Sequence, residues 1–289
     1  MLLGFSDYAG PGRALSNALK LEFAEIDVHR FPDGESKLTL PPQLPAHVVI
    51  CRSLDRPNDK LIELLLAAKT ARQLGARRLS LVAPYLCYLR QDMAFAPGEA
   101  VSQKIIGEFL ATLFDDVITV DPHLHRVHEL AEAVPTRHSL ALSAAPAMSS
   151  LLRSQPQALL MGPDSESRQW VQDIAERSGL DYAVASKTRL GDRQVRISLP
   201  ATSLHERNVV LVDDVISSGE TLAIAAQQCL QQGAREVNVL VTHPLFAVGA
   251  EQRLHQVGVK NIWSSDSIPH ATNAISLTAI LATAVRSLT

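Results

Sequence analysis

Short apolar runs alternate with longer segments of mixed apolar and polar residues along the whole chain. Three of these runs, Val48–Cys51, Leu79–Ala83 and Val209–Val212, are bounded by polar residues, as is typical of buried parallel strands. The Ala- and Gln-rich segment Thr221–Gly233 ends in glycine, which predicts a helix with a C-terminal glycine. This alternation predicts an α/β fold in which helices flank mostly parallel sheets.

The pattern of the first half of the chain recurs in the second half. The matching blocks are Leu2–Asp7 with Leu160–Ser165, Leu21–Leu40 with Leu180–Leu199, Val48–Cys51 with Val209–Val212, and Leu74–Pro84 with Gln232–Pro244. A period this long indicates two copies of one domain rather than a solenoid. The Ala-, Ser- and Pro-rich stretch Ser139–Pro156 separates the copies, so we expect domains at residues 1–142 and 143–289.

The segment Asp213–Thr221 joins the strand and the helix predicted in the second copy. A small-residue turn that opens a helix is typical of a phosphate cradle, because free backbone N–H groups and the positive helix end face the turn. Asp213 and Asp214 would repel a phosphate, so we expect them beside it, where they accept hydrogen bonds from sugar hydroxyls or hold a metal. The first copy has Arg52–Lys60 at this place, which is longer and lacks glycine. We therefore expect only the second copy to bind a phosphorylated sugar.

In the first copy, Phe31, Asp33 and Glu35 occupy alternate positions of the segment His29–Glu35. In an extended chain they would share one face, and an aromatic ring with two acceptors would suit a purine. Pro-Asp-Gly read alone indicates a turn.

Two further groups follow predicted strands of the first copy. Arg90 and Gln91 could bind a phosphate or a base, or lie in a solvated loop. Asp121 precedes three histidines, His123, His125 and His128, and such a mixed set could hold zinc or magnesium. We favour magnesium, because no other Cys or His set completes a zinc site.

In the second copy, Asp164 ends a strand and is a candidate either for a metal-facing carboxylate or for a helix N-cap. The basic segment Ser186–Arg196 contains a glycine and indicates a mobile hairpin. If it is extended, Lys187 and Arg189 point the same way, and two cations on a closing flap would neutralise charge during phosphoryl transfer. A solvated basic loop is the alternative.

Composition narrows the class of protein. A formal net charge of −3 and an aromatic content of 4% give no case for nucleic-acid or membrane binding. Cys51, Cys87 and Cys229 are far apart, which indicates core thiols in a reducing compartment, and we expect a cytoplasmic protein. The N-terminus lacks the features of a signal peptide, and no apolar stretch is long enough for a transmembrane helix.

Taken together, six ordered motifs resemble those of the ribose-phosphate diphosphokinases (PRPP synthetases), most closely the short archaeal-type members. They are Phe31 with Asp33–Glu35, Pro84–Gln91, Asp121 with His123, Pro163–Asp164, Lys187 with Arg189, and Asp213–Thr221. The chain departs from the family after Asp92, at Glu166–Ser167 and at Glu220, whose side chain we expect to point outward. The resemblance implies two tandem type I phosphoribosyltransferase-like domains that transfer diphosphate from Mg-ATP to ribose 5-phosphate.

The resemblance also implies roles for individual residues. ATP would be bound by Phe31, Asp33, Gly34, Glu35, Arg90 and Gln91; Mg²⁺ by His123 and Asp164; and ribose 5-phosphate by Arg189, Asp213, Asp214, Ser217, Ser218, Gly219, Glu220 and Thr221. Lys187 and Arg189 would be catalytic, and a neighbouring subunit of a homodimer or larger homo-oligomer would complete the ATP site. A transferase that consumes PRPP and a non-catalytic regulatory homologue are the alternative functions.

Overall fold

The structure is a computed structural model, and it describes residues 1–124, 127–189, 195–200 and 202–288. The chain divides into two compact units, one formed by Met1–Ser143 with Leu277–Thr289 and the other by Ala144–Ser276. The division after Ser143 lies next to the predicted boundary. The C-terminal helix α9 (Thr278–Ser287), which the sequence-based division assigned to the second half, packs on α1 (Ala9–Leu19) of the first unit.

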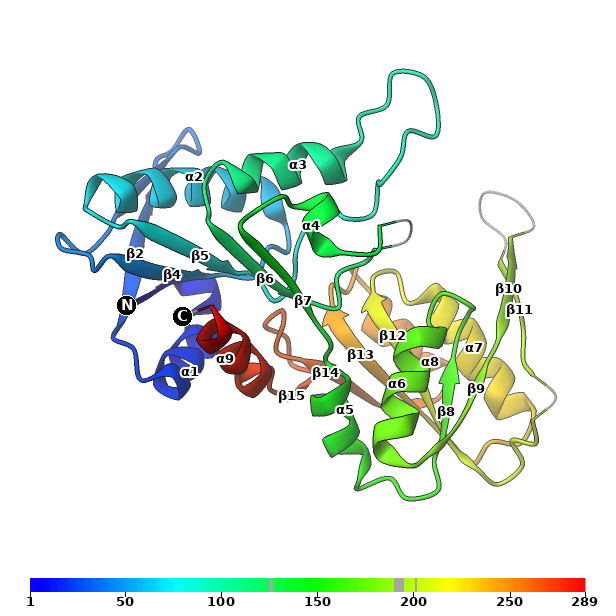
Figure 1. The fold of residues 1–289 in the computed structure, drawn as a ribbon. Coiled ribbons are helices and arrows are strands. Elements are labelled where there is room, and N and C mark those ends of the chain that lie inside the picture. The colour runs from blue at the N-terminus through cyan, green and yellow to red at the C-terminus, as the bar shows by residue number, and fades with distance from the viewer. Residues whose placement is uncertain (125–126, 190–194, 201, 289) are drawn as a thin grey trace. The chain divides into compact units, whose positions relative to one another are not determined.

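The first unit is built on a seven-stranded sheet in the order β3-β2-β1-β4-β5-β6-β7 (Figure 1). All neighbouring strands are parallel except β2 and β3, which form an antiparallel pair at the edge. The strands are β1 (Leu2–Phe5), β2 (Phe23–Arg30), β3 (Ser36–Thr39), β4 (His47–Cys51), β5 (Arg78–Val82), β6 (Asp116–Val120) and β7 (His138–Leu142).

Helices cover both faces of this sheet. One face carries α2 (Pro57–Gln73), α3 (Ser102–Ala111) and α4 (Leu130–Ala133), and the other carries α1 and α9 (Figure 1). A short 3₁₀ helix, η1 (Ser6–Tyr8), follows β1. Leu64 and Ala67 of α2 are fully buried against the strands, as an apolar helix stripe facing a sheet requires.

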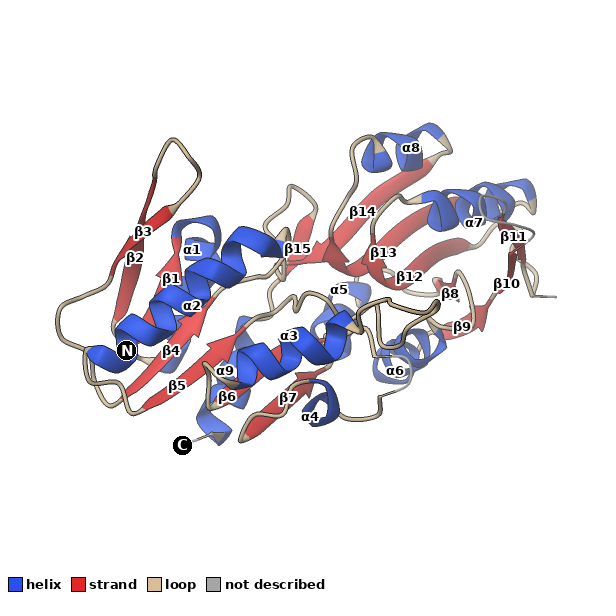
Figure 2. Cartoon of the chain, turned by 90° about the horizontal axis from the view of Figure 1, so that it is seen from above, coloured by secondary structure: helices blue, strands red, loops and turns tan. Residues whose placement is uncertain are grey.

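The second unit repeats this arrangement with a parallel six-stranded sheet in the order β15-β14-β13-β12-β8-β9. The strands are β8 (Leu159–Gly162), β9 (Asp181–Val184), β12 (Asn208–Ile216), β13 (Glu236–Pro244), β14 (Val259–Ser265) and β15 (Asn273–Ile275). Its helices are α5 (Ala145–Leu152), α6 (Arg168–Ser178), α7 (Glu220–Gln231) and α8 (Ala250–Gln256), with α7 and α8 on one face (Figure 2). The order β2-β1-β4-β5-β6-β7 thus recurs as β9-β8-β12-β13-β14-β15, which confirms the predicted α/β fold and its duplication.

Strand β12 is longer than the sequence predicted. The run Val209–Val212 was expected to stop before the two carboxylates, but β12 continues to Ile216 and pairs with β13 up to Pro244. The cause is tertiary, because β13 is equally long and offers a matching ladder of backbone groups beside Asp213 and Asp214. The turn is therefore shorter than predicted and consists of Ser217–Gly219.

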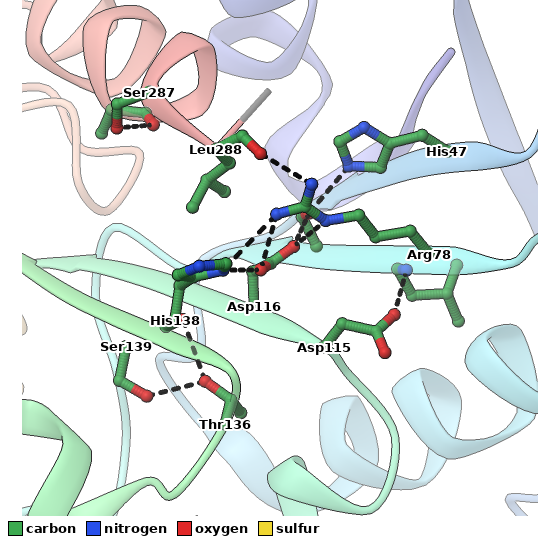
Figure 3. A network of polar contacts seen from close by, with 12 residues as sticks. His47, Arg78, Asp115, Asp116, Thr136, His138, Ser139, Ser287 and Leu288 are labelled. Carbon is green, nitrogen blue, oxygen red and sulfur yellow. Dashed lines mark hydrogen bonds and ion pairs between the residues drawn. The ribbon is translucent and has the colours of Figure 1, made fainter.

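Asp116 anchors a polar network at the amino ends of the strands in the first sheet (Figure 3). Its carboxylate accepts hydrogen bonds from Arg78 at 2.8 and 2.9 Å, from Ser80 at 2.6 Å and from His138 at 2.6 Å. Burial acts to raise the pKa of Asp116, but these hydrogen bonds and the Arg78 charge outweigh it and lower the pKa to about 2. Arg78 also donates to the Leu288 carbonyl at 2.6 Å, which fixes the end of α9 to the first unit.

The three cysteines are buried and free, as the sequence predicted. Burial raises the pKa of the Cys87 and Cys229 thiols to about 12, so both are held as inert thiols. No helix in the described ranges has the length and apolar character needed to cross a membrane.

Candidate functional site

The turn between β12 and α7 is open at the carboxyl edge of the second sheet. Ser217, Ser218 and Glu220 are exposed, and Glu220 points outward as expected. Gly219 has a φ of +70°, which favours glycine, and a Cβ there would come within 3.4 Å of the Ala250 carbonyl. Glycine at this position therefore lets the chain turn tightly into α7.

The carbonyls of the turn are held from the α8 side. The Ser217 carbonyl accepts the N–H of Ala247 at 2.9 Å, and the Ser218 carbonyl accepts Nη1 of Arg253 at 2.8 Å. Within the described ranges, the N–H groups of Ser218, Gly219 and Thr221 have no hydrogen-bond acceptor of the protein. Free amides at the start of a helix are the geometry that binds an anion.

Arg253 was not predicted from the sequence. It lies on α8, more than thirty residues after the turn, and nothing in its local sequence separates it from an ordinary exposed arginine. Its role as a support for the turn, and the positive charge it brings there, arise only from the packing of α7 against α8.

Three carboxylates meet at the ends of two neighbouring strands. Strands β8 and β12 are parallel, with Met161 opposite Leu211, so Asp164 follows β8 close to where Asp213 and Asp214 stand in β12. Burial raises the pKa of Asp213, and the negative charges of Asp214 and Asp164 raise it further. The strand ends thus concentrate negative charge beside an open anion site, an arrangement that suits sugar hydroxyls or a divalent cation.

Asp164 organises the turn that precedes α6. Its carboxylate accepts the backbone N–H groups of Glu166 at 3.1 Å and Ser167 at 3.3 Å, and its own carbonyl accepts the Ser167 hydroxyl at 2.6 Å. The N-cap of α6 is Ser167, without a side-chain capping bond, so the alternative that Asp164 caps this helix does not hold. The metal interpretation remains a prediction for this residue.

The predicted metal ligands lie in different units. His123 is half-buried after β6 in the first unit, and Asp164 is in the second; His125 lies outside the described residues. Within the part of the chain that the structure describes, no group of three or more His, Cys, Asp or Glu side chains is arranged to hold a metal by itself.

The basic segment of the second unit forms two antiparallel strands, β10 (Ser186–Arg189) and β11 (Val195–Ser198), as a hairpin interpretation requires. Lys187 pairs with Ile197 in the ladder, whereas the side chains of Lys187 and Arg189 and residues 190–194 lie outside the described part. Gln228 of α7 donates to the Ile197 carbonyl at 2.9 Å, so β11 is tied to the helix that starts at the open turn.

The segment Phe31–Glu35 is a turn, as Pro-Asp-Gly indicated, and the extended alternative with three residues on one face does not hold. The N–H of Phe31 donates to the Glu35 carbonyl at 2.8 Å, and the N–H of Gly34 donates to the Phe31 carbonyl at 2.9 Å. Gly34 has a φ of +94°, and Asp33 accepts the N–H of Glu35 at 3.2 Å. The local Pro-Asp-Gly chemistry decides the conformation here, and all five residues are exposed.

Arg90 and Gln91 lie in the long loop between β5 and α3. Arg90 is exposed and Gln91 is half-buried. The buried side chain of Gln103 donates to the Leu89 carbonyl at 3.3 Å, and its backbone N–H donates to the Gln91 carbonyl at 3.2 Å. Gln103 therefore holds the backbone on both sides of Arg90, a support that the sequence analysis missed.

The segment after β4, which corresponds to the open turn, is held by hydrogen bonds to β5 and to the loop that follows it. The N–H groups of Arg52 and Leu54 donate to the carbonyls of Val82 at 3.0 Å and Tyr85 at 2.9 Å. Lys60 donates to the Ser53 carbonyl at 2.9 Å. Within the described ranges, the N–H groups of Ser53, Asp55 and Arg56 have no hydrogen-bond acceptor of the protein, so the difference from the second unit lies in the side chains.

Charged side chains complete this closure. Arg52, buried to 4% exposure, bonds to Asp7 at 3.1 Å and to Glu63 at 2.7 Å. Lys60 bonds to Asp55 at 2.7 Å and to Asp7 at 3.1 Å. Cations and carboxylates of the segment therefore neutralise one another.

Comparisons with known proteins identify related sequences and folds. Residues 6–113 match the family model described as the N-terminal domain of ribose phosphate pyrophosphokinase, and residues 199–288 match the phosphoribosyl synthetase-associated domain. The chain is 32% identical to the ribose-phosphate pyrophosphokinase of Methanopyrus kandleri, covering 100% of this chain and 99% of the relative. It is also 32% identical to that of Saccharolobus solfataricus, with 93% of each covered.

A solved structure shares the fold. The phosphoribosylpyrophosphate synthetase of Mycobacterium smegmatis matches with a TM-score of 0.85 and 20% identity, covering 100% of this chain and 98% of the other.

Proposed function

Since the chain belongs to the ribose-phosphate pyrophosphokinase family, we propose that it transfers the β,γ-diphosphoryl group of ATP to the C1 hydroxyl of ribose 5-phosphate. The products are PRPP and AMP. In this reaction the C1 oxygen forms a bond to the β-phosphorus, the bond from that phosphorus to the oxygen shared with the α-phosphate breaks, and the proton of the C1 hydroxyl is released. AMP leaves with the bridging oxygen.

The observation that carries the proposal is the open turn Ser217–Gly219 beside buried carboxylates. The free N–H groups of Ser218, Gly219 and Thr221 at the start of α7 suit the dianionic 5-phosphate. Asp213 stands at the same strand end and suits the ribose hydroxyls, which donate to a carboxylate. An anion site and an adjacent carboxylate together match a phosphorylated sugar better than either a free phosphate or a neutral sugar.

In the first unit, we assign ATP to the exposed turn Phe31–Glu35 and to the loop that carries Arg90 and Gln91. Phe31 is 41% exposed, and its ring is free to stack on a base. The carboxylates of Asp33 and Glu35 suit the exocyclic amine of adenine. In the homo-oligomer that we propose, a neighbouring subunit completes this site.

Catalysis in this proposal rests on positioning and on charge neutralisation. Lys187 and Arg189 neutralise charge on the transferred group, and the tie between Gln228 and Ile197 keeps their hairpin near the helix that begins at the phosphate turn.

The donor set fits a divalent cation that is bound partly by substrate. Burial raises the pKa of Asp213, and the negative charges of Asp214 and Asp164 raise it further; a bound cation would relieve the repulsion between these carboxylates. Because the described residues offer no complete protein cage, the substrate phosphates and water would supply the remaining oxygens, as magnesium prefers. We assign Asp164 and His123 to Mg²⁺, which would neutralise negative charge of the substrate phosphates when bound.

Product identification tests the proposal. Purified protein incubated with ATP, ribose 5-phosphate and Mg²⁺ is expected to form AMP and PRPP in equal amounts, detected by chromatography and phosphorus NMR. Formation of ADP, or no nucleotide product, contradicts the proposal. Release of diphosphate from added PRPP that depends on a free base indicates the alternative, a phosphoribosyltransferase.

A matched pair of variants tests whether the activity belongs to the assigned hairpin. Lys187→Ala is expected to lower kcat by about 10²–10³-fold, the usual cost of removing one donor that stabilises transition-state charge. The control Lys69→Ala removes a lysine from α2, outside the assigned residues, and is expected to keep the wild-type rate. Unchanged activity in Lys187→Ala contradicts its catalytic role.

A further inference from the structure

Glu63 of α2 is a buried carboxylate that two hydrogen-bond donors and one buried cation approach. Its side chain is 1% exposed. Oε1 accepts hydrogen bonds from Nη2 of Arg30 at 3.0 Å and from the Ser36 hydroxyl at 2.9 Å. Oε2 lies 2.7 Å from Nη1 of Arg52 and forms an ion pair with it, without hydrogen-bond geometry. The two hydrogen bonds to Oε1 therefore connect Glu63 to Arg30 and Ser36.

Two of these donors flank the exposed turn of the first unit. Arg30 is the last residue of β2 and Ser36 is the first residue of β3, and they face each other as the final pair of the ladder. The turn Phe31–Glu35 lies between them, at the edge of the sheet. Glu63 thus binds both ends of the turn from a neighbouring helix, and α2 packs against β3 to bring it there.

Arg52 keeps the charge of Glu63 in place. The Arg52 guanidinium donates through Nε to both oxygens of Asp7 at 3.2 Å and lies over the Phe5 ring at 3.9 Å from its centre. These contacts hold Arg52 in addition to its ion pair with Glu63. A buried carboxylate needs such a partner, because an unpaired charge in this position would be strongly destabilising.

The remaining hydrogen bonds of the turn are local. Phe31 and Glu35 bond to each other, Gly34 bonds to Phe31, and Asp33 bonds to Glu35, so none of them connects the turn to another element. Phe31 has one further contact, edge to face with the ring of His29 on the adjoining strand. Among the described residues, the two ends of the turn are bonded to α2, Ser36 through Glu63 and Arg30 through both Glu63 and Asp59.

We propose that Glu63 is a positioning residue for the nucleotide, which acts by holding Arg30 and Ser36 and so preorganises the turn. The inference rests on the proposed function, in which this turn binds the adenine of ATP. An exposed turn that is already ordered loses less conformational freedom when a ligand binds. Loss of a bond between Glu63 and Arg30 or Ser36 therefore weakens ATP binding and leaves the chemical step and the sugar-phosphate site unchanged.

The sharpest test removes one donor and leaves the buried ion pair intact. Ser36→Ala deletes the hydroxyl, while Glu63 keeps Arg30 and Arg52. The KM for ATP is expected to rise about three- to tenfold, the value of one hydrogen bond to a charged group. The kcat and the KM for ribose 5-phosphate are expected to change by less than about twofold, and Ser36→Thr, which keeps the hydroxyl, is expected to restore the KM for ATP.

Arg30→Gln provides a second, independent variant. It removes the bond to Glu63 and an exposed bond to Asp59, and it is expected to raise the KM for ATP by a similar factor. The matched control is Arg13→Gln, which breaks an exposed pair between α1 and Glu25 at the other end of β2. The control is expected to keep both KM values.

A wild-type KM for ATP in Ser36→Ala and Arg30→Gln overturns the inference, and so does a parallel change in both KM values, which indicates general loosening. Failure of the proposed function has a different signature. The wild-type protein then forms no AMP and binds no ATP in calorimetry, whereas failure of the inference alone leaves a wild-type enzyme that forms AMP and variants that bind ATP equally well.

Discussion

Strands β4 and β12 occupy the same place in their two sheets, but the charged groups that follow them have different partners. After β4, the side chains of Arg52 and Lys60 pair with nearby carboxylates. After β12, burial raises the pKa of Asp213 and the charges of Asp214 and Asp164 raise it further, beside turn amides that have no acceptor within the described ranges.

The difference shows how one half of a duplicated domain can lose a ligand site without losing stability. The first unit supplies from its own side chains the opposite charges that a ligand would otherwise provide. The second unit leaves amides and carboxylates for a ligand to satisfy, so part of its stability depends on binding. The comparison therefore predicts opposite consequences for mutations at the two strand ends.

The largest effect is expected from opening the closed end in the first unit. Arg52→Met leaves Glu63 and Asp7 without their buried cation, so the free energy of unfolding is expected to fall by about 3–5 kcal/mol. Urea denaturation measures this loss. The control Arg13→Met breaks an exposed pair and is expected to change stability by less than about 1 kcal/mol; equal effects in the two variants would show that the network is not a buried ion pair in solution.

A carboxylate introduced into the open turn of the second unit should abolish the binding of ribose 5-phosphate. Ser218→Asp places a carboxylate beside the free amides, and repulsion of the 5-phosphate is expected to raise the KM for ribose 5-phosphate about 100-fold. Ser150→Asp makes the same change at an exposed position of α5 and should leave this KM unaltered. A small effect at Ser218 would place the phosphate elsewhere.

The buried carboxylate of Asp116 tests whether the first unit neutralises its charges with its own side chains. The pKa of Asp116 is lowered to about 2 in the folded protein, so its stabilising contribution is full above the ordinary carboxyl pKa of about 4 and is lost as the pH falls through about 2. Asp116→Asn is expected to cost about 2 kcal/mol near neutral pH. Unfolding curves between pH 2 and 7 should show the gap between wild type and variant narrowing in acid, and a constant gap would contradict the lowered pKa.

Asp213 should show the reverse dependence, with a smaller amplitude. Its pKa is raised in the folded state, so the folded protein holds this proton more tightly than the unfolded chain. Stability is therefore lost as the pH rises from about 4 through the raised pKa, and the penalty is complete above it. Asp213→Asn is expected to be about 1–2 kcal/mol more stable at neutral pH and inactive, with the advantage disappearing in acid.

The exposed pair of Asp173 with Arg177 provides the control for Asp213. Asp173→Asn removes one carboxylate from an i,i+4 pair on α6 and is expected to change stability by less than about 0.5 kcal/mol, without inversion of the pH dependence. If Asp213→Asn destabilises the protein at neutral pH, the charge of Asp213 has a cation partner in solution, and the contrast between the two halves is wrong.

Local pattern was sufficient to predict the layered fold, the duplication and the turn that opens α7, because apolar periodicity and glycine placement are properties of short segments. The end of β12 could not be predicted this way, since β13 carries the ladder past Asp213 and Asp214. At Phe31–Glu35 the sequence left a turn and an extended segment open, and the turn chemistry of Pro-Asp-Gly decides for the turn.

The residues that support the site could not be predicted from the sequence. Arg253, Gln103 and Glu63 act on backbone or side chains more than ten residues away, and each lies on a helix with no unusual local sequence. Their partners are chosen by helix packing, so a single sequence without a structure carries no signal for them. Candidate ligand residues can be found from the sequence, whereas the residues that position them require the fold.

The most direct test of the contrast between the two strand ends is a crystal structure of the protein with ribose 5-phosphate. The account predicts the 5-phosphate at the N–H groups of Ser218, Gly219 and Thr221, with ribose hydroxyls on Asp213, and no phosphate against Ser53–Arg56 of the first unit. A phosphate bound after β4, or a second unit whose turn amides are free of phosphate at saturating ligand, would contradict it.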